Sequence, residues 1–322
     1  MSNKHIDIVV PCFNEEECIP LFFDEVSQVF SNIDMTDFTI IFVDDGSRDN
    51  TLNTIRNLAQ THGAERVKYI SFSRNFGKES AIYAGLNATK SELVVLMDAD
   101  LQHPPALLPM MIHVIEEGYD SCAMYRSNRQ GEPALRSLFS RWFYSFFDSI
   151  SSVKMKPSST DFRLMTRQMV DSVLSLGETE RFTKGLFQWV GFKTKWIDSK
   201  NVERASGESK FSFFSLFRYA INGIVAFSTV PLRFASIIGF LVIIAAFSYM
   251  VVVIIRVLIF GSSAPGFATI VVLMLFLGGI IISLLGIIGE YISRIYQEVK
   301  RRPIFIAKET NITNEEVDYV RR

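Results

Sequence analysis

The sequence has few cysteines and no excess of charge of either sign. Cys12, Cys18 and Cys122 are the only cysteines in 322 residues, and their spacings match neither a disulfide framework nor a zinc-binding pattern. The 33 Lys and Arg residues nearly balance the 34 Asp and Glu residues, which gives a net charge of -1. This balance argues against a nucleic-acid-binding protein held by a broad basic surface.

Two common nucleotide-binding motifs and a secretory signal are also missing. There is no G-x-G-x-x-G and no G-x-x-x-x-G-K-[ST], so a nicotinamide cofactor and a P-loop nucleotide site are both disfavoured. The first apolar stretch, residues 8–10, is too short for the core of a signal peptide. We therefore expect the N-terminal part of the chain to stay in the cytosol.

Charged residues are scarce near the C-terminus. Residues 234–255 and 267–289 contain none, and at about 1.5 Å per helical residue each run is long enough to cross a bilayer core. The turn-rich segment 261–266 joins them. Basic residues cluster at the outer ends of the pair, whereas Arg256 is the only charged residue near the turn. The positive-inside rule therefore predicts a membrane hairpin with both outer ends in the cytoplasm.

Residues 1–210 alternate between short apolar runs and amphipathic segments, which predicts an α/β domain with a mostly parallel sheet. In such a sheet, ligands bind beyond the carboxyl ends of the strands. The predicted strands are 6–10, 38–43, 67–72, 93–97 and 121–125, and the predicted helices are 21–30, 51–60, 78–88 and 105–117.

Two aromatic-rich segments lie between this domain and the apolar runs. The large apolar residues of 134–150 recur on one helical face, and 211–231 leads directly into the first run. Such helices beside a membrane span suit the lipid interface, with ordinary core packing as the alternative. We expect a cytoplasmic catalytic domain (1–210) that includes the interfacial helix 134–150, a juxtamembrane helix (211–231), two transmembrane helices within 232–289 (about 234–258 and 267–289), and a cytoplasmic tail (290–322).

Polar side chains follow the predicted strands. Asp98 and Asp100 come directly after one apolar run, and Gln102 lies two residues further on. Two carboxylates and an amide oxygen are the hard ligands that Mg²⁺ or Mn²⁺ prefers, and such an ion would neutralise a departing diphosphate. A helix-capping turn is the alternative interpretation of these residues.

Two further clusters follow the first and second predicted strands. Their acidic and amide groups can accept hydrogen bonds from a nucleobase or from ribose hydroxyls. The first cluster holds Pro11, Asn14 and Glu15, and the second holds Asp44 and Asp45.

As a set, these motifs resemble family 2 glycosyltransferases of the GT-A fold. The resemblance lies in residues 11–15 (PCFNE), 43–47 (VDDGS), 73–79 (SRNFGKE) and 98–104 (DADLQHP). More narrowly, they are similar to the polyprenyl-phosphate glycosyltransferases, a group that includes dolichol-phosphate mannose synthase. Residues 161–164 (DFRL), 181–185 (RFTKG) and 289–291 (GEY) resemble the bacterial bactoprenol glucosyltransferase branch. The resemblance ends at about residue 306.

The resemblance implies a role for individual residues. Asp161 and Asp100 would be the catalytic carboxylates, and Asp161 would position the acceptor or take a proton from it. A phosphate acceptor is largely dianionic at neutral pH, so a strong base is not needed. The metal would be held by Asp98, Asp100 and Gln102; the nucleotide sugar by Pro11, Asn14, Glu15, Asp44, Asp45, Lys78 and Asp98; and the lipid phosphate by Arg126, Arg136, Ser140, Arg204 and Lys210.

The activity implied by the resemblance is an inverting, metal-dependent transfer of a hexose from a UDP-sugar to undecaprenyl phosphate at the cytoplasmic face of a bacterial membrane. Glucose is the first choice of sugar, N-acetylglucosamine the second, and Mg²⁺ or Mn²⁺ the cofactor. A homotetramer, a flippase for the lipid-linked sugar and a downstream glycosyltransferase are further implied partners.

Two other functions are disfavoured. Processive polysaccharide synthases carry Q-x-x-R-W and more spans, but here Leu138 occupies the Gln position of that motif. A non-enzymatic scaffold with a degenerate transferase domain does not explain the intact Asp98, Asp100 and Asp161.

Overall fold

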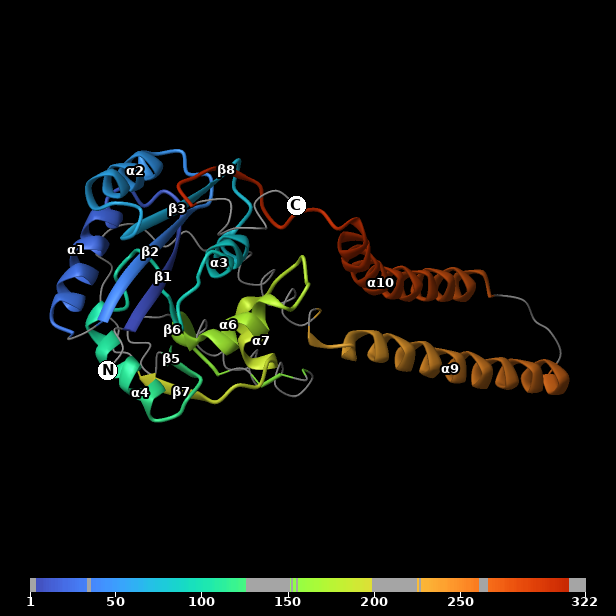
Figure 1. The fold of residues 1–322 in the computed structure, drawn as a ribbon. Coiled ribbons are helices and arrows are strands. Elements are labelled where there is room, and N and C mark those ends of the chain that lie inside the picture. Colours follow the sequence, from blue (N-terminus) through green and yellow to red (C-terminus); the bar gives the residue numbers. More distant parts are fainter. Residues whose placement is uncertain are drawn as a thin grey trace.

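A globular α/β part and a pair of long helices that extends from it make up the structure, which is a computed structural model (Figure 1). It describes residues 4–33, 36–125, 151, 153–154, 156–198, 225, 227–260 and 266–312. The expected interfacial helix 134–150 and most of the expected juxtamembrane helix 211–231 lie outside the described residues.

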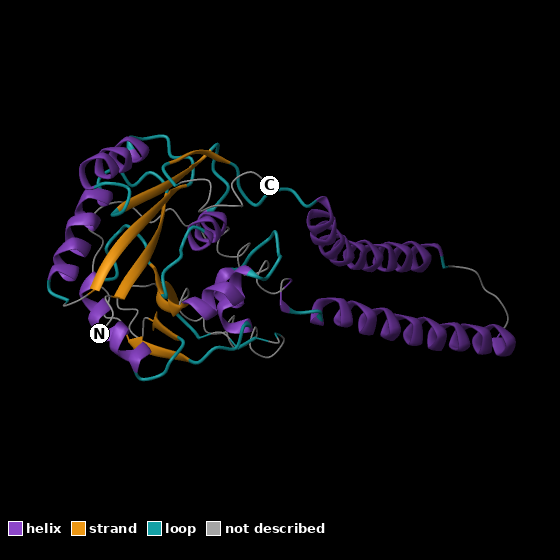
Figure 2. Ribbon diagram, viewed as in Figure 1, coloured by secondary structure: helices purple, strands orange, loops and turns teal. Residues whose placement is uncertain are grey.

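A mixed sheet forms the centre of the globular part, and Figure 2 shows its strands in orange. Across the described residues, the strand order is β7-β5-β6-β4-β1-β2-β3-β8. Only β6 and β8 run antiparallel to their neighbours. The strands are β1 (Lys4–Cys12), β2 (Thr36–Asp44), β3 (Val67–Phe72), β4 (Leu93–Leu96), β5 (Ser121–Tyr125), β6 (Ser159–Thr166), β7 (Thr194–Asp198) and β8 (Ala307–Thr310).

Helices cover both faces of the sheet, and this explains why apolar residues predominate at successive positions of the central strands. On β1, Ile8 packs with the helices of one face, whereas its neighbour Val9 packs with Ile82 and Phe187 on the other. The first face carries α1 (Cys18–Ser31), α2 (Thr51–His62) and α4 (Leu108–Glu116), which follows the short 3₁₀ helix η1 (Pro105–Leu107); the second carries α3 (Lys78–Asn87), α6 (Arg167–Leu174) and α7 (Thr183–Trp189).

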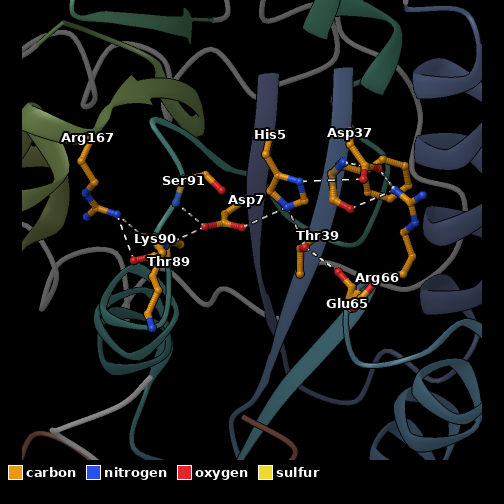
Figure 3. Close-up of polar contacts among 11 residues, drawn as sticks. His5, Asp7, Asp37, Thr39, Glu65, Arg66, Thr89, Lys90, Ser91 and Arg167 are labelled. Carbon is orange, nitrogen blue, oxygen red and sulfur yellow. Dashed lines mark hydrogen bonds and ion pairs between the residues drawn. The ribbon is translucent and has the colours of Figure 1, made fainter. Parts of the chain in front are cut away.

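The amino ends of β1 and β2 are joined by polar contacts that lie away from the expected ligand edge (Figure 3). Asp7 is buried and accepts hydrogen bonds from the backbone N–H groups of Lys90 and Ser91, at 2.7 and 2.9 Å. His5 Nε2 lies 2.9 Å from Thr39 Oγ1. These contacts hold the segment after α3 against β1 and leave the carboxyl edge of the sheet to the site residues.

Two long apolar helices, α9 (Val230–Phe260) and α10 (Phe267–Lys300), run side by side away from the sheet (Figure 1). Within them, Val230–Arg256 and Phe276–Lys300 are long and apolar enough to cross a membrane, and their side chains are not buried inside the protein. The α/β class, the mostly parallel sheet and the two apolar C-terminal helices predicted from the sequence are confirmed.

The C-terminal end of α10 contacts the globular part. Glu298 accepts hydrogen bonds from both the backbone N–H and the hydroxyl of Thr179, at 2.8 and 3.0 Å. The hydroxyl of Tyr291 donates a hydrogen bond to the carbonyl of Ser228, over 2.7 Å. The first contacts tie α10 to the loop that precedes α7, and the last ties it to the segment that leads into α9.

After α10 the chain returns to the sheet. β8 pairs antiparallel with β3, and the ring of Phe305 stacks on Phe72 with 4.9 Å between centroids. Asn311 accepts a hydrogen bond from the backbone N–H of Tyr69, over 2.7 Å. The segment expected as a tail therefore contains the end of α10 and an edge strand of the sheet.

Candidate active site

Lys78 lies between two carboxylates at the carboxyl end of β4. Its ammonium nitrogen is 2.7 Å from Oδ1 of Asp98 and 2.5 Å from Oδ2 of Asp161. The strand register explains this arrangement. β4 and β6 are antiparallel neighbours in which Leu96 pairs with Arg163. Asp98 follows Leu96 by two residues and Asp161 precedes Arg163 by two, so the same register brings these two carboxylates close together.

The second oxygen of Asp161 faces another lysine. Nζ of Lys184, on the first turn of α7, lies 3.6 Å from Asp161 Oδ1 and donates a hydrogen bond to the carbonyl of Ser159 over 3.2 Å. A line of alternating charges thus runs from the end of β4 to α7 through Asp98, Lys78, Asp161 and Lys184. We call these four side chains the charge row.

The charges of the row fix its protonation. Burial alone would raise the pKa of Asp161, but Lys184 and Lys78 together hold that pKa below its usual range. Burial alone would lower the pKa of Lys78, but Asp98 and Asp161 raise it above its usual range. Asp161 is therefore a carboxylate and Lys78 an ammonium at neutral pH.

A buried arginine lies on the same face of β6 as Asp161. Arg163 is 1% exposed, and its guanidinium carbon is 4.1 Å from the ring centroid of Phe187. Burial lowers the pKa of Arg163 to about 10, so it stays charged at neutral pH. Its Nε and Nη1 atoms have no hydrogen-bond partner among the described residues. This positive charge also helps to lower the pKa of Asp161.

The segment after Asp98 forms a tight turn of oxygen donors. Asp100 accepts a hydrogen bond from the backbone N–H of Gln102 over 3.1 Å. Leu101, between them, has φ +55°, a left-handed conformation that is uncommon for leucine. No group of three or more His, Cys, Asp or Glu residues in the described part of the chain is arranged to hold a metal. Two carboxylates with one amide oxygen nevertheless fit a divalent ion by donor chemistry.

The second β–α loop is built around two buried carboxylates. Asp44 accepts hydrogen bonds from the backbone N–H of Ser47 (3.0 Å) and from the hydroxyl of Ser71 (2.8 Å). Asp45 accepts hydrogen bonds from the backbone N–H groups of Phe76 (2.7 Å) and Gly77 (2.9 Å). Burial raises the pKa of Asp45 despite these backbone bonds. Asp45 therefore fixes the loop that immediately precedes Lys78.

The first β–α loop is locked to the second. Asn14 has φ +56°, and its side-chain oxygen accepts a hydrogen bond from the backbone N–H of Arg48 over 2.9 Å. The backbone N–H of Glu15 donates to the hydroxyl of Thr51 over 2.8 Å. Pro11 pairs in register with Val43 at the end of β1.

The structure brings most of the sequence-predicted site residues to one edge of the sheet. They form two neighbouring groups, linked by the hydrogen bonds that Asp45 accepts from the loop before Lys78. The first group contains Pro11, Asn14, Glu15, Asp44 and Asp45, and the second contains Lys78, Asp98, Asp100, Gln102 and Asp161. Arg126, Arg136, Ser140, Arg204 and Lys210 lie outside the described residues.

Two charged neighbours of the site were not assigned a role from the sequence. Lys184 lies within the RFTKG motif, and Arg163 lies within DFRL, two residues after Asp161. Side chains two positions apart on a strand share a face, and this rule alone places Arg163 beside Asp161. The sequence contains no comparable signal for Lys184, because its contact with Asp161 depends on how α7 packs.

Comparisons with known proteins cover nearly the whole chain. The model of glycosyl transferase family 2 matches residues 7–174, which include Lys78, Asp98 and Asp161. The putative glycosyltransferase CsbB of Bacillus subtilis (strain 168) is 46% identical over 98% of this chain and 95% of its own length. The SfII prophage-derived bactoprenol glucosyl transferase of Shigella flexneri is 40% identical over 96% of this chain and 99% of its own.

Solved structures resemble this chain more distantly. The mannosyltransferase PcManGT from Pyrobaculum calidifontis, in complex with GDP-Man and Mn²⁺, is 17% identical. It covers 70% of this chain and 63% of its own, with a TM-score of 0.48.

Proposed function

This chain belongs to glycosyltransferase family 2, and we propose that it transfers glucose from UDP-glucose to undecaprenyl phosphate. The observation that carries the proposal is the charge row at the carboxyl edge of the sheet, on a chain that also has two membrane-type helices. The relative named as a bactoprenol glucosyl transferase, which is matched almost from end to end, supports this choice of sugar and acceptor.

The donor is proposed to bind where the loops after β1 and β2 meet the end of β4. The nucleotide is surrounded by residues of these two adjoining loops, Pro11, Asn14, Glu15 and Asp44. The loops offer amide and carboxylate oxygens that accept hydrogen bonds from the base and the ribose. Asp45 holds the loop beneath the diphosphate, and Lys78 faces that diphosphate from the start of α3. Asp98, Asp100 and Gln102 would hold Mg²⁺ or Mn²⁺, which supplies positive charge for the leaving diphosphate.

The acceptor phosphate is proposed to attack the anomeric carbon directly. A new bond forms between a phosphate oxygen and this carbon, while the bond from the carbon to the UDP oxygen breaks, so the anomeric configuration inverts. A phosphate monoester has its second pKa near 6, so it is mostly a dianion at neutral pH and has no proton that must be removed before it attacks. Asp161 is itself a carboxylate paired with two lysines. It therefore orients the reacting groups and does not serve as a strong base.

The membrane placement follows from the same elements. We propose that α9 and α10 form a transmembrane hairpin whose outer ends lie at the cytoplasmic face. The lipid phosphate would then reach the site from the bilayer surface. The pocket that receives it would include Arg126, Arg136, Ser140, Arg204 and Lys210.

The proposal is tested with the purified full chain, undecaprenyl phosphate and a panel of UDP-glucose, UDP-N-acetylglucosamine and UDP-galactose. Mass spectrometry of the lipid should find a hexose-phosphate product from UDP-glucose. Asp100→Asn should abolish most of this transfer, because it removes a charged donor from the turn. Asp24→Asn, on the exposed side of α1, is the matched control. The absence of lipid-linked sugar from every donor, or wild-type transfer by Asp100→Asn, would contradict the proposal.

A further inference from the structure

The segment before and at the start of α7 connects α10 to the charge row. At one end of it, Thr179 donates two hydrogen bonds to Glu298 of α10. At the other end, the backbone N–H of Thr183 donates to Glu79 over 2.8 Å, and Glu79 is the neighbour of Lys78 on α3. A carboxylate at a helix N-terminus is favourable, because it accepts hydrogen bonds from N–H groups left without partners in the first turn.

The same segment is closely packed and hydrogen-bonded. Arg181 is buried and donates to the carbonyls of Leu176 (2.7 Å) and Val173 (2.9 Å). Gly185 has no room for a side chain, because a Cβ there would lie 2.3 Å from the ring of Phe227. Phe227 lies three residues before α9, so α7 begins against the entry to the first membrane-type helix. Figure 1 shows α7 on the side of the globular part that faces α9.

Lys184 is the member of the charge row whose chain neighbour, Gly185, lies against Phe227 ahead of α9. Asp98, at the opposite end of the row, belongs to the proposed metal and diphosphate site. Lys184 is separated from it by Lys78 and Asp161. The row thus has a donor end and a membrane end.

The ammonium of Lys184 is held in place and still has N–H donors available for a ligand. An ammonium has three N–H donors. Among the described residues, that of Lys184 donates one hydrogen bond, to Ser159, while Asp161 lies at 3.6 Å. Its side chain is 27% exposed, so an anion can reach it. A compact, positionally fixed ammonium suits a phosphate monoester, since it acts as a point charge with rotatable donors.

We propose that Lys184 binds the phosphate of the lipid acceptor. Asp161 pairs with both lysines and so fixes the distance between Lys184, which faces the acceptor phosphate, and Lys78, which faces the donor diphosphate. This inference rests on the proposed function. It assigns the RFTKG motif a role in acceptor recognition, with Thr179 and Glu298 fixing its position relative to the membrane-type helices.

The test compares wild type, Lys184→Ala, Lys184→Arg and the control Lys90→Ala, whose lysine lies at the opposite edge of the sheet. Removing a charge-assisted hydrogen bond should raise the KM for undecaprenyl phosphate by about 10- to 100-fold. The KM for UDP-glucose should change less than about twofold, since the contacts of Lys184 within the described part of the chain are with Asp161 and Ser159 and not with the proposed metal and diphosphate residues. Lys184→Arg should recover part of the loss, and Lys90→Ala should match the wild type.

A binding measurement separates this inference from the proposed function. Native mass spectrometry of the full chain is carried out with undecaprenyl phosphate, with undecaprenol, which lacks the phosphate, and with inorganic phosphate. The wild type should retain undecaprenyl phosphate over undecaprenol, and Lys184→Ala should lose that preference while still binding UDP. Retention of inorganic phosphate alone would show a free-anion site.

The outcomes are distinct. If the wild type prefers the phosphorylated lipid through Lys184 but makes no product, the proposed transfer is wrong and the inference stands. The inference is overturned if Lys184→Ala keeps the wild-type preference, if the wild type has no preference for the phosphorylated lipid, or if only UDP binding is lost.

Discussion

Lys78 donates a hydrogen bond to Asp161 over 2.5 Å, although 83 positions separate the two residues in the sequence. The bond matters because the same ammonium lies 2.7 Å from Asp98, so two carboxylates meet at one nitrogen beyond the carboxyl end of β4. Carboxylates so placed repel each other unless a cation lies between them. Lys78 is that cation, and Asp45 fixes the backbone immediately before it.

Replacing Lys78 with Gln should therefore disable the site. The substitution removes the cation that lies between Asp98 and Asp161, leaving Lys184 as the lysine paired with Asp161. It also removes a charge that faces the proposed diphosphate. We expect the rate of glucose transfer to fall by about 10²- to 10³-fold, the usual effect of removing one charged or polar donor from a transition state. Radiolabelled transfer to undecaprenyl phosphate measures the rate, and Lys90→Gln is the control. A Lys78→Gln variant with wild-type kcat/KM would show that the row has no part in the reaction.

Removing the metal should have a different effect from removing a lysine. Chelation by EDTA should abolish transfer, and added Mg²⁺ or Mn²⁺ should restore it. Gln102→Leu removes one of three proposed oxygen donors, so it should raise the metal concentration needed for half-maximal activity by about tenfold while the rate at saturation recovers. Gln168→Leu, at an exposed position of α6, is the control. Full activity after exhaustive chelation would refute the metal assignment.

The turn that holds Asp44 and Asp45 depends on the glycine that follows them. Gly46 has φ +67°, and a Cβ at this position would lie 2.5 Å from the carbonyl carbon of Arg74. Gly46→Ala combines backbone strain with a clash against another backbone, so we expect it to cost more than about 1 kcal/mol of stability. It should also weaken UDP binding. Thermal unfolding and UDP titration measure the two effects.

Gly177→Ala is the matched control for this substitution, because a Cβ at Gly177 meets no atom within 4 Å. If both variants unfold at the wild-type temperature, the close approach of the loops that contain Gly46 and Arg74 does not limit which residue can stand at position 46.

Strand prediction from the sequence succeeded for strands with both faces buried beneath helices, and it failed for strands that carry charged or polar residues. β1 to β4 lie between helices on both faces, so each is mostly apolar, with few polar interruptions such as Asp7 and Lys68, and can be recognised by itself. β6 contains Asp161 and Arg163, which break such a run, although Arg163 is itself buried. β8 is the short polar sequence AKET, and only its contacts with β3 define it as a strand.

The candidate site shows the same limit. Asp98, Asp100 and Gln102 could be recognised as a group because they lie within five residues and follow an apolar strand. Lys184 could not, since it lies 23 positions after Asp161 and reaches it only through the packing of α7 against β6. Sequence patterns report local periodicity, whereas a charge row built across α3, β4, β6 and α7 depends on long-range packing.

The C-terminal return to the sheet predicts an acid-sensitive contact. Glu309 on β8 forms an ion pair with Arg56 and accepts a hydrogen bond from the hydroxyl of Tyr69 over 2.7 Å. The hydrogen bond from Arg56, opposed by partial burial, lowers the pKa of Glu309 from 4.5 to about 2. A lowered pKa in the folded state means that this stabilisation is complete above pH 4.5 and is lost as the pH falls towards 2.

Glu309→Gln should therefore lower the unfolding temperature by a few degrees at pH 7, and the gap from the wild type should shrink as the pH falls from about 4.5 towards 2. Glu25→Gln, at an exposed position of α1, is the control and should leave the unfolding temperature unchanged across the range. Hydrogen exchange should locate the effect, because the amide of Tyr69 is bonded to Asn311 and should lose protection first. A gap that stays constant down to pH 2 would mean that the Glu309 carboxylate does not stabilise the return of β8 to the sheet.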